Sequence, residues 1–174
     1  PVAAPDGATV AEDGTVNIVV LGNDQPGDDP FDPAWVAPVG TDERVTVRSD
    51  GSIDFTPEAN FNGPTGFSYT VCTTVGSCAS AVVDVTVTSV NDLPVAGAVT
   101  AGTSEDGSLT LDLAGAVSDA DGDVLTIRLD PVVGPTIGSA SLSGSVLTYT
   151  PFPDLNGVEV VAFSACDADA CAPG

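Results

Sequence analysis

The sequence repeats itself after about 93 residues, so we expect it to fold as two copies of one unit. Five short landmarks recur in the same order in both halves of the 174-residue chain. They are Glu12-Asp13-Gly14 and Glu105-Asp106-Gly107, Thr56-Pro57 and Thr150-Pro151, Phe61-Asn62-Gly63 and Leu155-Asn156-Gly157, Cys72 and Cys166, and Cys78 and Cys171. Self-similarity at a fixed period indicates tandem copies of one structural unit. The copies join at Val90-Asn91-Asp92-Leu93-Pro94, where the proline favours an extended connection.

Short apolar runs bounded by Gly, Asp, Asn or Pro predict strands joined by turns, and helical periodicity is absent. The expected strands are 15–21, 45–48, 52–56, 66–71, 79–89, 108–113, 124–129, 139–142, 146–150 and 158–165. Copies of about 90 residues have the size of an immunoglobulin-like sandwich. We therefore expect an all-β chain of two tandem immunoglobulin/cadherin-like β-sandwiches, residues 1–90 and 91–174. The second is expected to lack its last strand within this chain, since Gly174 follows Cys171 by three residues.

The four cysteines lie where neighbouring strands would meet. In residues 66–72 and 78–87 the large apolar side chains alternate, and the cysteines fall on the opposite face. We predict two local disulfides, Cys72–Cys78 and Cys166–Cys171. Four cysteines also allow two other pairings, and a metal site is the competing interpretation. Disulfides indicate an oxidising compartment outside the cytoplasm.

The charge balance excludes several classes of function. The chain has 25 acidic and 3 basic side chains and no histidine, which gives a net charge of −22. Nucleic acids and anionic membranes would repel such a chain. The absence of histidine and lysine removes the usual general base and the usual Schiff-base amine. We therefore expect no enzymatic activity, no nucleic-acid partner and no membrane insertion.

Beyond the repeat, a set of ordered motifs covers almost the whole chain. The second copy contains Asn91-Asp92-Leu93-Pro94, Glu105-Asp106-Gly107, Asp119-Ala120-Asp121-Gly122-Asp123, Tyr149-Thr150-Pro151 and Leu155-Asn156-Gly157. The first copy contains Phe55-Thr56-Pro57, Phe61-Asn62-Gly63 and Phe67-Ser68-Tyr69-Thr70-Val71. These motifs resemble the cadherin-like and immunoglobulin-like tandem repeats of large bacterial surface adhesins. The resemblance implies a calcium-stiffened rod segment at the cell surface. Two features depart from that pattern, namely the hairpin cysteines and the segment 23–29, which replaces the carboxylate-rich loop in the first copy.

Acidic side chains are expected to converge where the two copies join. In a sandwich of alternating strand directions, the first turn lies where the chain leaves, and the loop after the second strand lies where it enters. Calcium takes 6–8 oxygen ligands, so the convergence predicts a Ca²⁺ site. Its expected ligands are Glu12, Asp13, Asn91, Asp92, Asp119, Asp121 and Asp123. The competing interpretations are a metal-free Asx turn and a surface adapted to high salt. Asn23, Asp24, Asp28 and Asp29 are weaker candidates for a second site.

Other functions remain open from the sequence, among them an accessory domain of a secreted hydrolase, and two of them rest on residues of this chain. One is a ligand-binding module that holds a glycan or protein at Trp35. The other is a filament subunit, because an open sheet edge in the second copy could accept a strand from an identical chain. Residues 1–10, for which no strand is predicted, are the candidate donor. The expected partners are neighbouring repeats of the same or identical chains.

Overall fold

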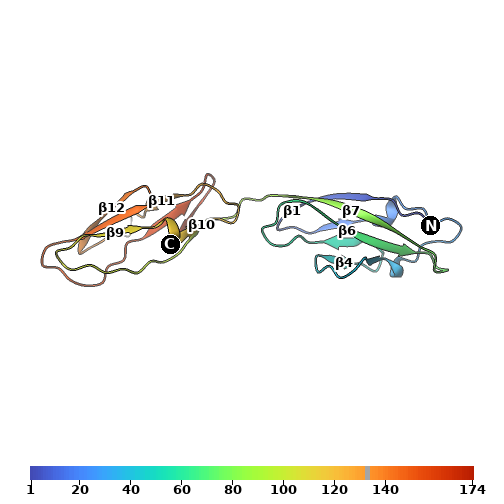
Figure 1. Ribbon diagram of the computed structural model, residues 1–174, viewed down its shortest axis with the longest axis horizontal. Helices are drawn as coiled ribbons and strands as arrows, with labels where there is room; N and C mark the ends of the chain where they lie inside the picture. The colour runs from blue at the N-terminus through green and yellow to red at the C-terminus, as the bar shows by residue number, and fades with distance from the viewer. Residues whose placement is uncertain (132–133) are drawn as a thin grey trace. The chain divides into compact units, whose positions relative to one another are not determined.

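The computed structural model describes residues 1–131 and 134–174. Within them the chain forms two compact units, Pro1–Val90 and Asn91–Gly174, called unit 1 and unit 2 below (Figure 1). The elements are strands and three 3-10 turns of three residues each. The predicted all-β architecture of two tandem sandwiches is therefore confirmed.

Unit 1 is a sandwich of a four-stranded and a three-stranded sheet. The strand order is β1-β7-β6-β3 in the larger sheet and β2-β5-β4 in the smaller. The strands are β1 (Asp6–Ala11), β2 (Val16–Ile18), β3 (Ala37–Pro38), β4 (Val45–Val47), β5 (Ile53–Phe55), β6 (Gly63–Cys72) and β7 (Cys78–Thr88), and the 3-10 turns are η1 (Val20–Gly22) and η2 (Pro33–Trp35). The long β6–β7 hairpin forms the centre of the larger sheet (Figure 1).

The core of unit 1 follows from the alternation in its long strands. Along β7, Val83, Val85 and Val87 are buried while the residues between them are exposed. On the other sheet Phe55 is fully buried and stacks on Phe67, with ring centroids 5.7 Å apart. Burial of large apolar side chains is the main source of stability in such a small domain.

The first strand was not expected from the sequence. β1 pairs with β7 in parallel, from Asp6 opposite Val83 to Ala11 opposite Thr88. The prediction that residues 1–10 form a free donor strand is therefore wrong, because β1 already occupies the edge of β7. The run Gly7-Ala8-Thr9-Val10 has small side chains and only a weak apolar alternation, which is why it was missed.

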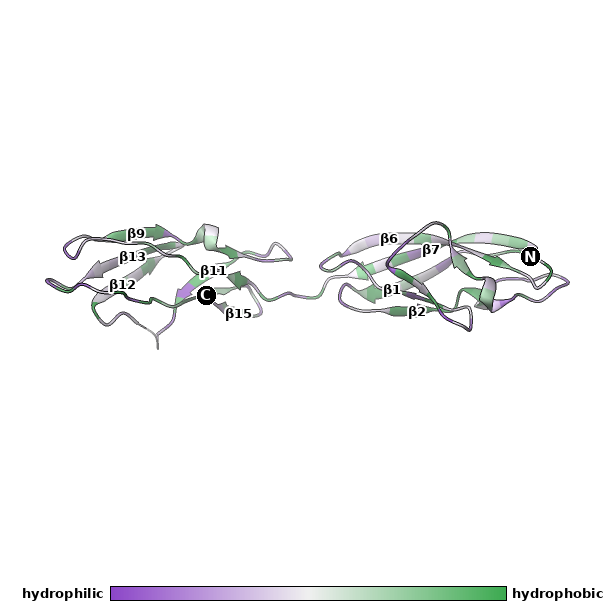
Figure 2. Ribbon diagram, turned by 90° about the horizontal axis from the view of Figure 1, so that it is seen from below, coloured by the Kyte–Doolittle hydropathy of each residue, from purple (hydrophilic) through white to green (hydrophobic). Residues whose placement is uncertain are grey.

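Unit 2 repeats this plan with shorter strands. Its two three-stranded sheets have the orders β12-β13-β9 and β11-β14-β15, and β8 pairs with β10. The strands are β8 (Val95–Ala96), β9 (Leu109–Asp112), β10 (Val117–Ser118), β11 (Thr126–Leu129), β12 (Gly138–Ser143), β13 (Val146–Pro151), β14 (Phe163–Cys166) and β15 (Cys171–Pro173), with a 3-10 turn η3 (Ala114–Ala116). Figure 2 shows β9 largely in the green of hydrophobic residues, in keeping with the burial of this sheet's inner face.

One side of unit 2 is open. The expected strand 158–165 begins only at Phe163, and Val158 is 97% exposed. A groove of about 650 Å³ lies between residues 98–105 and 155–163 and is lined by Leu111, Leu147 and other apolar side chains. In unit 1, by contrast, Val83, Val85 and Val87 of the long strand β7 belong to the buried core. Within residues 91–131 and 134–174, unit 2 has no counterpart of the long strand β7, as predicted, and residues 158–162 form no ladder.

Both hairpins are closed by disulfides. Cys72 is bonded to Cys78, and Cys166 is bonded to Cys171. In each unit the two cysteines are direct partners across antiparallel strands, as the strand parity predicts. Across residues 1–131 and 134–174, the structure contains no helix that is long and apolar enough to cross a membrane.

Candidate metal centre

The carboxylate-rich loop of unit 2 follows β10 and precedes β11. Asp119 Oδ1 accepts hydrogen bonds from the backbone N–H groups of Asp121 (2.9 Å) and Asp123 (3.3 Å), which curls the loop around the Asp119 side chain. Gly122 has φ +77°, a conformation that glycine adopts without steric cost. Carboxylate oxygens of Asp119, Asp121 and Asp123, one from each, all lie within 4.8 Å of one another. Oxygens bound to a single calcium ion at 2.3–2.6 Å have separations of this size.

Residues 91 and 92 are tied to this loop within unit 2. The backbone N–H of Asp92 donates to Asp121 Oδ2 at 2.7 Å. Asn91 Nδ2 donates to the Asp92 carbonyl oxygen at 3.0 Å and to Asp167 Oδ2 at 3.2 Å. A continuous set of hydrogen bonds therefore connects Asp121, Asp92, Asn91 and Asp167. Of the predicted ligands, the structure brings together those that belong to unit 2.

Asp167 was not among the predicted ligands. It follows β14, and β14 pairs with β11 so that Cys166 lies opposite Thr126, three residues after Asp123. This register carries Asp167 to the carboxylate loop. From the sequence, Asp167 could have been found by pairing the expected strands 124–129 and 158–165 antiparallel. That pairing places the end of the later strand beside the start of the earlier one.

The carboxylates of the cluster repel one another. Burial raises the pKa of the Asp123 carboxyl, and the charges of Asp119, Asp121, Asp167 and Asp169 raise it further. The pKa of Asp167 is lowered, first by the backbone N–H of Ala170 and then by the Asn91 side chain. Among the described residues, the buried Asp119 Oδ2 has no hydrogen-bond partner. A divalent cation would offset this repulsion and satisfy that oxygen.

Glu12 and Asp13 belong to unit 1 and lie in the turn after β1. Glu12 is only 1% exposed, and its Oε1 accepts a hydrogen bond of 2.6 Å from the backbone N–H of Val90. Its other oxygen, Oε2, is buried without a hydrogen-bond partner in the described part of the chain. A buried carboxylate oxygen without a partner is costly, so this geometry favours a cation. Asp13 is exposed.

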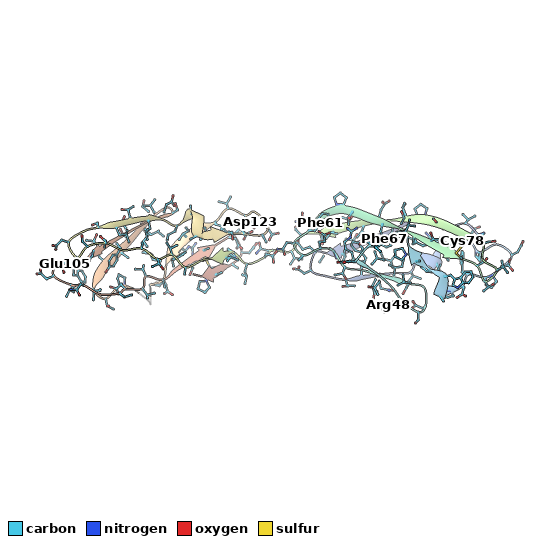
Figure 3. All side chains as sticks on the ribbon, turned by 60° about the horizontal axis from the view of Figure 1, so that its bottom comes forward. Arg48, Phe61, Phe67, Cys78, Glu105 and Asp123 are labelled. Carbon is cyan, nitrogen blue, oxygen red and sulfur yellow. A yellow bond between two sulfur atoms is a disulfide. The ribbon has the colours of Figure 1, made fainter. Side chains whose placement is uncertain are left out.

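The two acidic ends of unit 2 are far apart. Figure 3 shows Glu105 and Asp123 at opposite ends of this unit. Glu105 is the repeat equivalent of Glu12, whose side chain bonds to the last residue of unit 1. The turn with the Glu-Asp-Gly motif and the carboxylate loop therefore mark opposite ends of one sandwich.

The first-copy segment 23–29 is used mainly for hydrogen bonds inside unit 1. Asp24 accepts from the backbone N–H of Ala4 at 2.8 Å and from the buried Tyr69 hydroxyl at 2.9 Å. Asn23 Nδ2 donates to the Pro5 carbonyl oxygen. Burial raises the pKa of the nearby Asp6, and the charge of Asp24 adds to that rise. Asp28 is exposed and Asp29 is partly buried, and a metal role for Asn23, Asp24, Asp28 and Asp29 stays a prediction.

Trp35 lies in η2, whose preceding Asp32 accepts from the Ala34 N–H. Its side chain is 48% exposed. Ligand binding at Trp35 stays a prediction, as does strand exchange between identical chains at the groove of unit 2.

Comparison with known proteins adds the family context. A family model described as "Bacterial Ig domain" matches residues 1–86 and 91–173. Among solved structures, Drosophila N-cadherin EC1-4 covers 98% of this chain and 46% of its own, with a TM-score of 0.56 and 13% identity. Protocadherin Gamma B2 domains 1-5 cover 98% of this chain and 36% of their own, with a TM-score of 0.51 and 15% identity. At these sequence identities, the similarity to both structures is a similarity of fold alone.

An enzyme chain also matches, with a lower TM-score. The family 107 glycoside hydrolase MfFcnA4_H294Q, an endo-fucoidan hydrolase, covers 98% of this chain and 26% of its own, with a TM-score of 0.37 and 14% identity. A similarity this low says nothing about activity. No curated protein matches the chain. The chain spans about a quarter to a half of the length of the three structures named here.

Proposed function

The chain belongs to the bacterial Ig domain family, and on this basis we propose that it is a non-enzymatic, extracellular spacer stiffened by calcium within a bacterial surface adhesin. The observation that carries the proposal is the cluster of Asp119, Asp121 and Asp123, tied through the Asp92 N–H to the segment that joins the repeats.

The proposed ligand set combines residues of both repeats. Asp92, Asp119, Asp121 and Asp123 supply carboxylate oxygens from the second repeat, and Asn91 supplies its amide oxygen. Glu12 and Asp13 complete the set from the first repeat. The orphaned Oε2 of Glu12 supports this, because Glu12 bonds to Val90 and the chain continues directly into Asn91 and Asp92.

A cation bound by both repeats would resist bending at the connection, which is the property a spacer needs. In this chain the same carboxylates that repel one another without metal would become ligands with it. Calcium is preferred over transition metals because the proposed donors are all oxygens and the chain contains no histidine.

Extracellular localisation and lack of enzymatic activity are parts of the same proposal. Two disulfides favour an oxidising compartment. The composition supplies neither histidine nor lysine for acid–base or Schiff-base chemistry. Both points support a structural role.

Asp121→Asn is expected to raise the calcium dissociation constant by about tenfold or more, since it removes a charged ligand. The amide oxygen can still accept from the Asp92 N–H, so the loop should keep its conformation. Calorimetric titration of the full chain with calcium chloride measures the effect.

The matched control for that titration is Asp154→Asn. Asp154 is exposed and has φ +59°, a conformation that asparagine also adopts readily, so this change removes the same charge with little strain. Wild-type affinity is expected for the control. Equal affinities of all three proteins would contradict a role for Asp121, and absence of calcium binding by the wild type would contradict the proposed function.

A further inference from the structure

The disulfide hairpin of unit 2 presents a carboxylate to the metal centre. Cys166 and Cys171 enclose residues 167–170, and Asp167 comes directly after the first cysteine. Through Asn91, Asp167 is hydrogen-bonded to the same network that contains Asp92 and Asp121. The hairpin therefore places the Asp167 carboxylate next to the cluster, bonded to Asn91 and close enough for its charge to raise the pKa of Asp123.

The conformation of Asp167 depends on the hairpin being closed. Its backbone N–H donates to the Ala170 carbonyl oxygen at 3.0 Å. Its Oδ1 accepts from the backbone N–H groups of Asp169 (2.7 Å) and Ala170, which leaves Oδ2 facing Asn91. The bonds to Asp169 and Ala170 join residues inside the loop that the disulfide closes.

The strand pairing of this hairpin is short, although the Gly174 N–H adds a hydrogen bond to the Phe163 carbonyl oxygen at 2.8 Å. β15 pairs with β14 through only three residue pairs, from Ser164–Pro173 to Cys166–Cys171. Cys166 itself is 2% exposed, while Cys171 is exposed. A cross-link that closes a loop removes open conformations, and it matters most where the remaining pairing is short.

The equivalent hairpin in unit 1 is built differently. Its disulfide, Cys72–Cys78, closes residues 73–77, which contain no carboxylate. Thr73 replaces Asp167, is buried, and accepts from the Ser77 N–H. The neighbouring segment also holds this hairpin, because Thr74 N–H donates to the Pro30 carbonyl oxygen and Phe31 bridges to Thr73. The disulfide hairpin of unit 1 is therefore an internal control for the disulfide hairpin of unit 2.

We propose that the Cys166–Cys171 disulfide is a positioning element of the metal centre, which holds Asp167 beside the carboxylate loop and thereby raises calcium affinity. The inference rests on the proposed function, since it concerns the same site. The Cys72–Cys78 disulfide has no such role. Loss of a group that orients metal ligands commonly weakens binding by 10–100-fold, and here we expect about tenfold.

The coupling is reciprocal. If the disulfide raises calcium affinity tenfold, bound calcium must disfavour reduction of that disulfide tenfold, which corresponds to about 30 mV. Dithiothreitol supplies two electrons and two protons, so the S–S bond becomes two thiols and the reductant leaves as its cyclic disulfide. The Cys72–Cys78 bond in the same molecule should not respond to calcium.

The first experiment is a calcium titration by calorimetry on five full-chain proteins. Three of them are the wild type, Cys72→Ser/Cys78→Ser and Cys166→Ser/Cys171→Ser. The other two carry Asp167→Asn, one with the Cys166–Cys171 disulfide intact and one with Cys166→Ser/Cys171→Ser. Relative to the wild type, we expect about tenfold weaker calcium affinity when Cys166–Cys171 is lost and unchanged affinity when Cys72–Cys78 is lost, and Asp167→Asn alone should weaken binding to a similar extent as loss of Cys166–Cys171. In the Asp167→Asn background, loss of that disulfide should change the affinity less than about twofold, because the carboxylate it positions is gone.

The second experiment needs no disulfide variant and therefore does not depend on its folding. The oxidised wild type is equilibrated with graded dithiothreitol, with calcium chloride or with EDTA, and the thiols are alkylated and assigned by mass spectrometry. We expect calcium to shift the reduction midpoint of Cys166–Cys171 alone. Equal responses of both disulfides, or of neither, in a protein that binds calcium would overturn the inference and leave the proposed function standing. Failure of the wild type to bind calcium would overturn both.

Discussion

Removal of calcium is expected to lower the free energy of unfolding by about 2.7 kcal/mol, relative to a sample in which free calcium exceeds its dissociation constant a hundredfold. The reason is that the folded chain gathers Asp119, Asp121 and Asp123 within 4.8 Å, whereas the unfolded chain separates them. Without the ion the folded state retains their repulsion and the buried, unpartnered oxygen of Asp119.

Thermal unfolding with calcium chloride or with EDTA measures this effect. For a domain of this size, 2.7 kcal/mol corresponds to a Tm shift of roughly 10–20 °C. Magnesium chloride at the same ionic strength is the control for screening, since magnesium prefers smaller, more regular sites that retain water. Asp121→Asn should lose most of the calcium-dependent shift. A midpoint that is identical in calcium and EDTA contradicts the expectation.

Phe55→Ala is expected to destabilise unit 1 by about 3–5 kcal/mol. Phe55 has no exposed surface, it stacks on Phe67 with an interplanar angle of 8°, and the Arg44 guanidinium lies 5.4 Å from its ring centroid. Truncation leaves a cavity between the two sheets and removes these contacts. A loss of this size is a large part of the stability of a small domain.

The matched control is Phe61→Ala, because Phe61 is 36% exposed and lies in a loop. Urea denaturation should place its cost well below that of Phe55→Ala, at about 1 kcal/mol. Calcium affinity should be unchanged in Phe61→Ala. Similar denaturation midpoints for the two variants would show that the core of unit 1 is not where the structure places it.

The long strands could be predicted because their alternation is strong. In β6 and β7 large apolar side chains recur at every second position, and this parity also predicted the pairing of Cys72 with Cys78. β1 was missed because its side chains are small and its partner, β7, is some 75 residues away. For residues 158–162 the error is the opposite one, since a strand was predicted there and none is formed. They have a strand-like sequence, but a strand also needs a neighbouring backbone to pair with.

The candidate site was predictable where its residues form a local motif. The Asp119–Asp123 loop follows from its spacing of aspartates around Gly122. The position of Asp167 does not follow from a local motif, because only the register of β11 with β14 brings it to that loop. The burial of Glu12 could not be predicted either, since its bond to the Val90 N–H joins residues 78 positions apart.

The most direct test of calcium stiffening is ¹⁵N relaxation of the full chain, which reports the rotational correlation time of each unit separately. With saturating calcium, the amides of Pro1–Val90 and Asn91–Gly174 should report one common and longer correlation time. With EDTA, each unit should report its own shorter time, and Asp121→Asn should resemble this state even in calcium. Two separate correlation times that calcium leaves unchanged would contradict the proposal that calcium stiffens this chain.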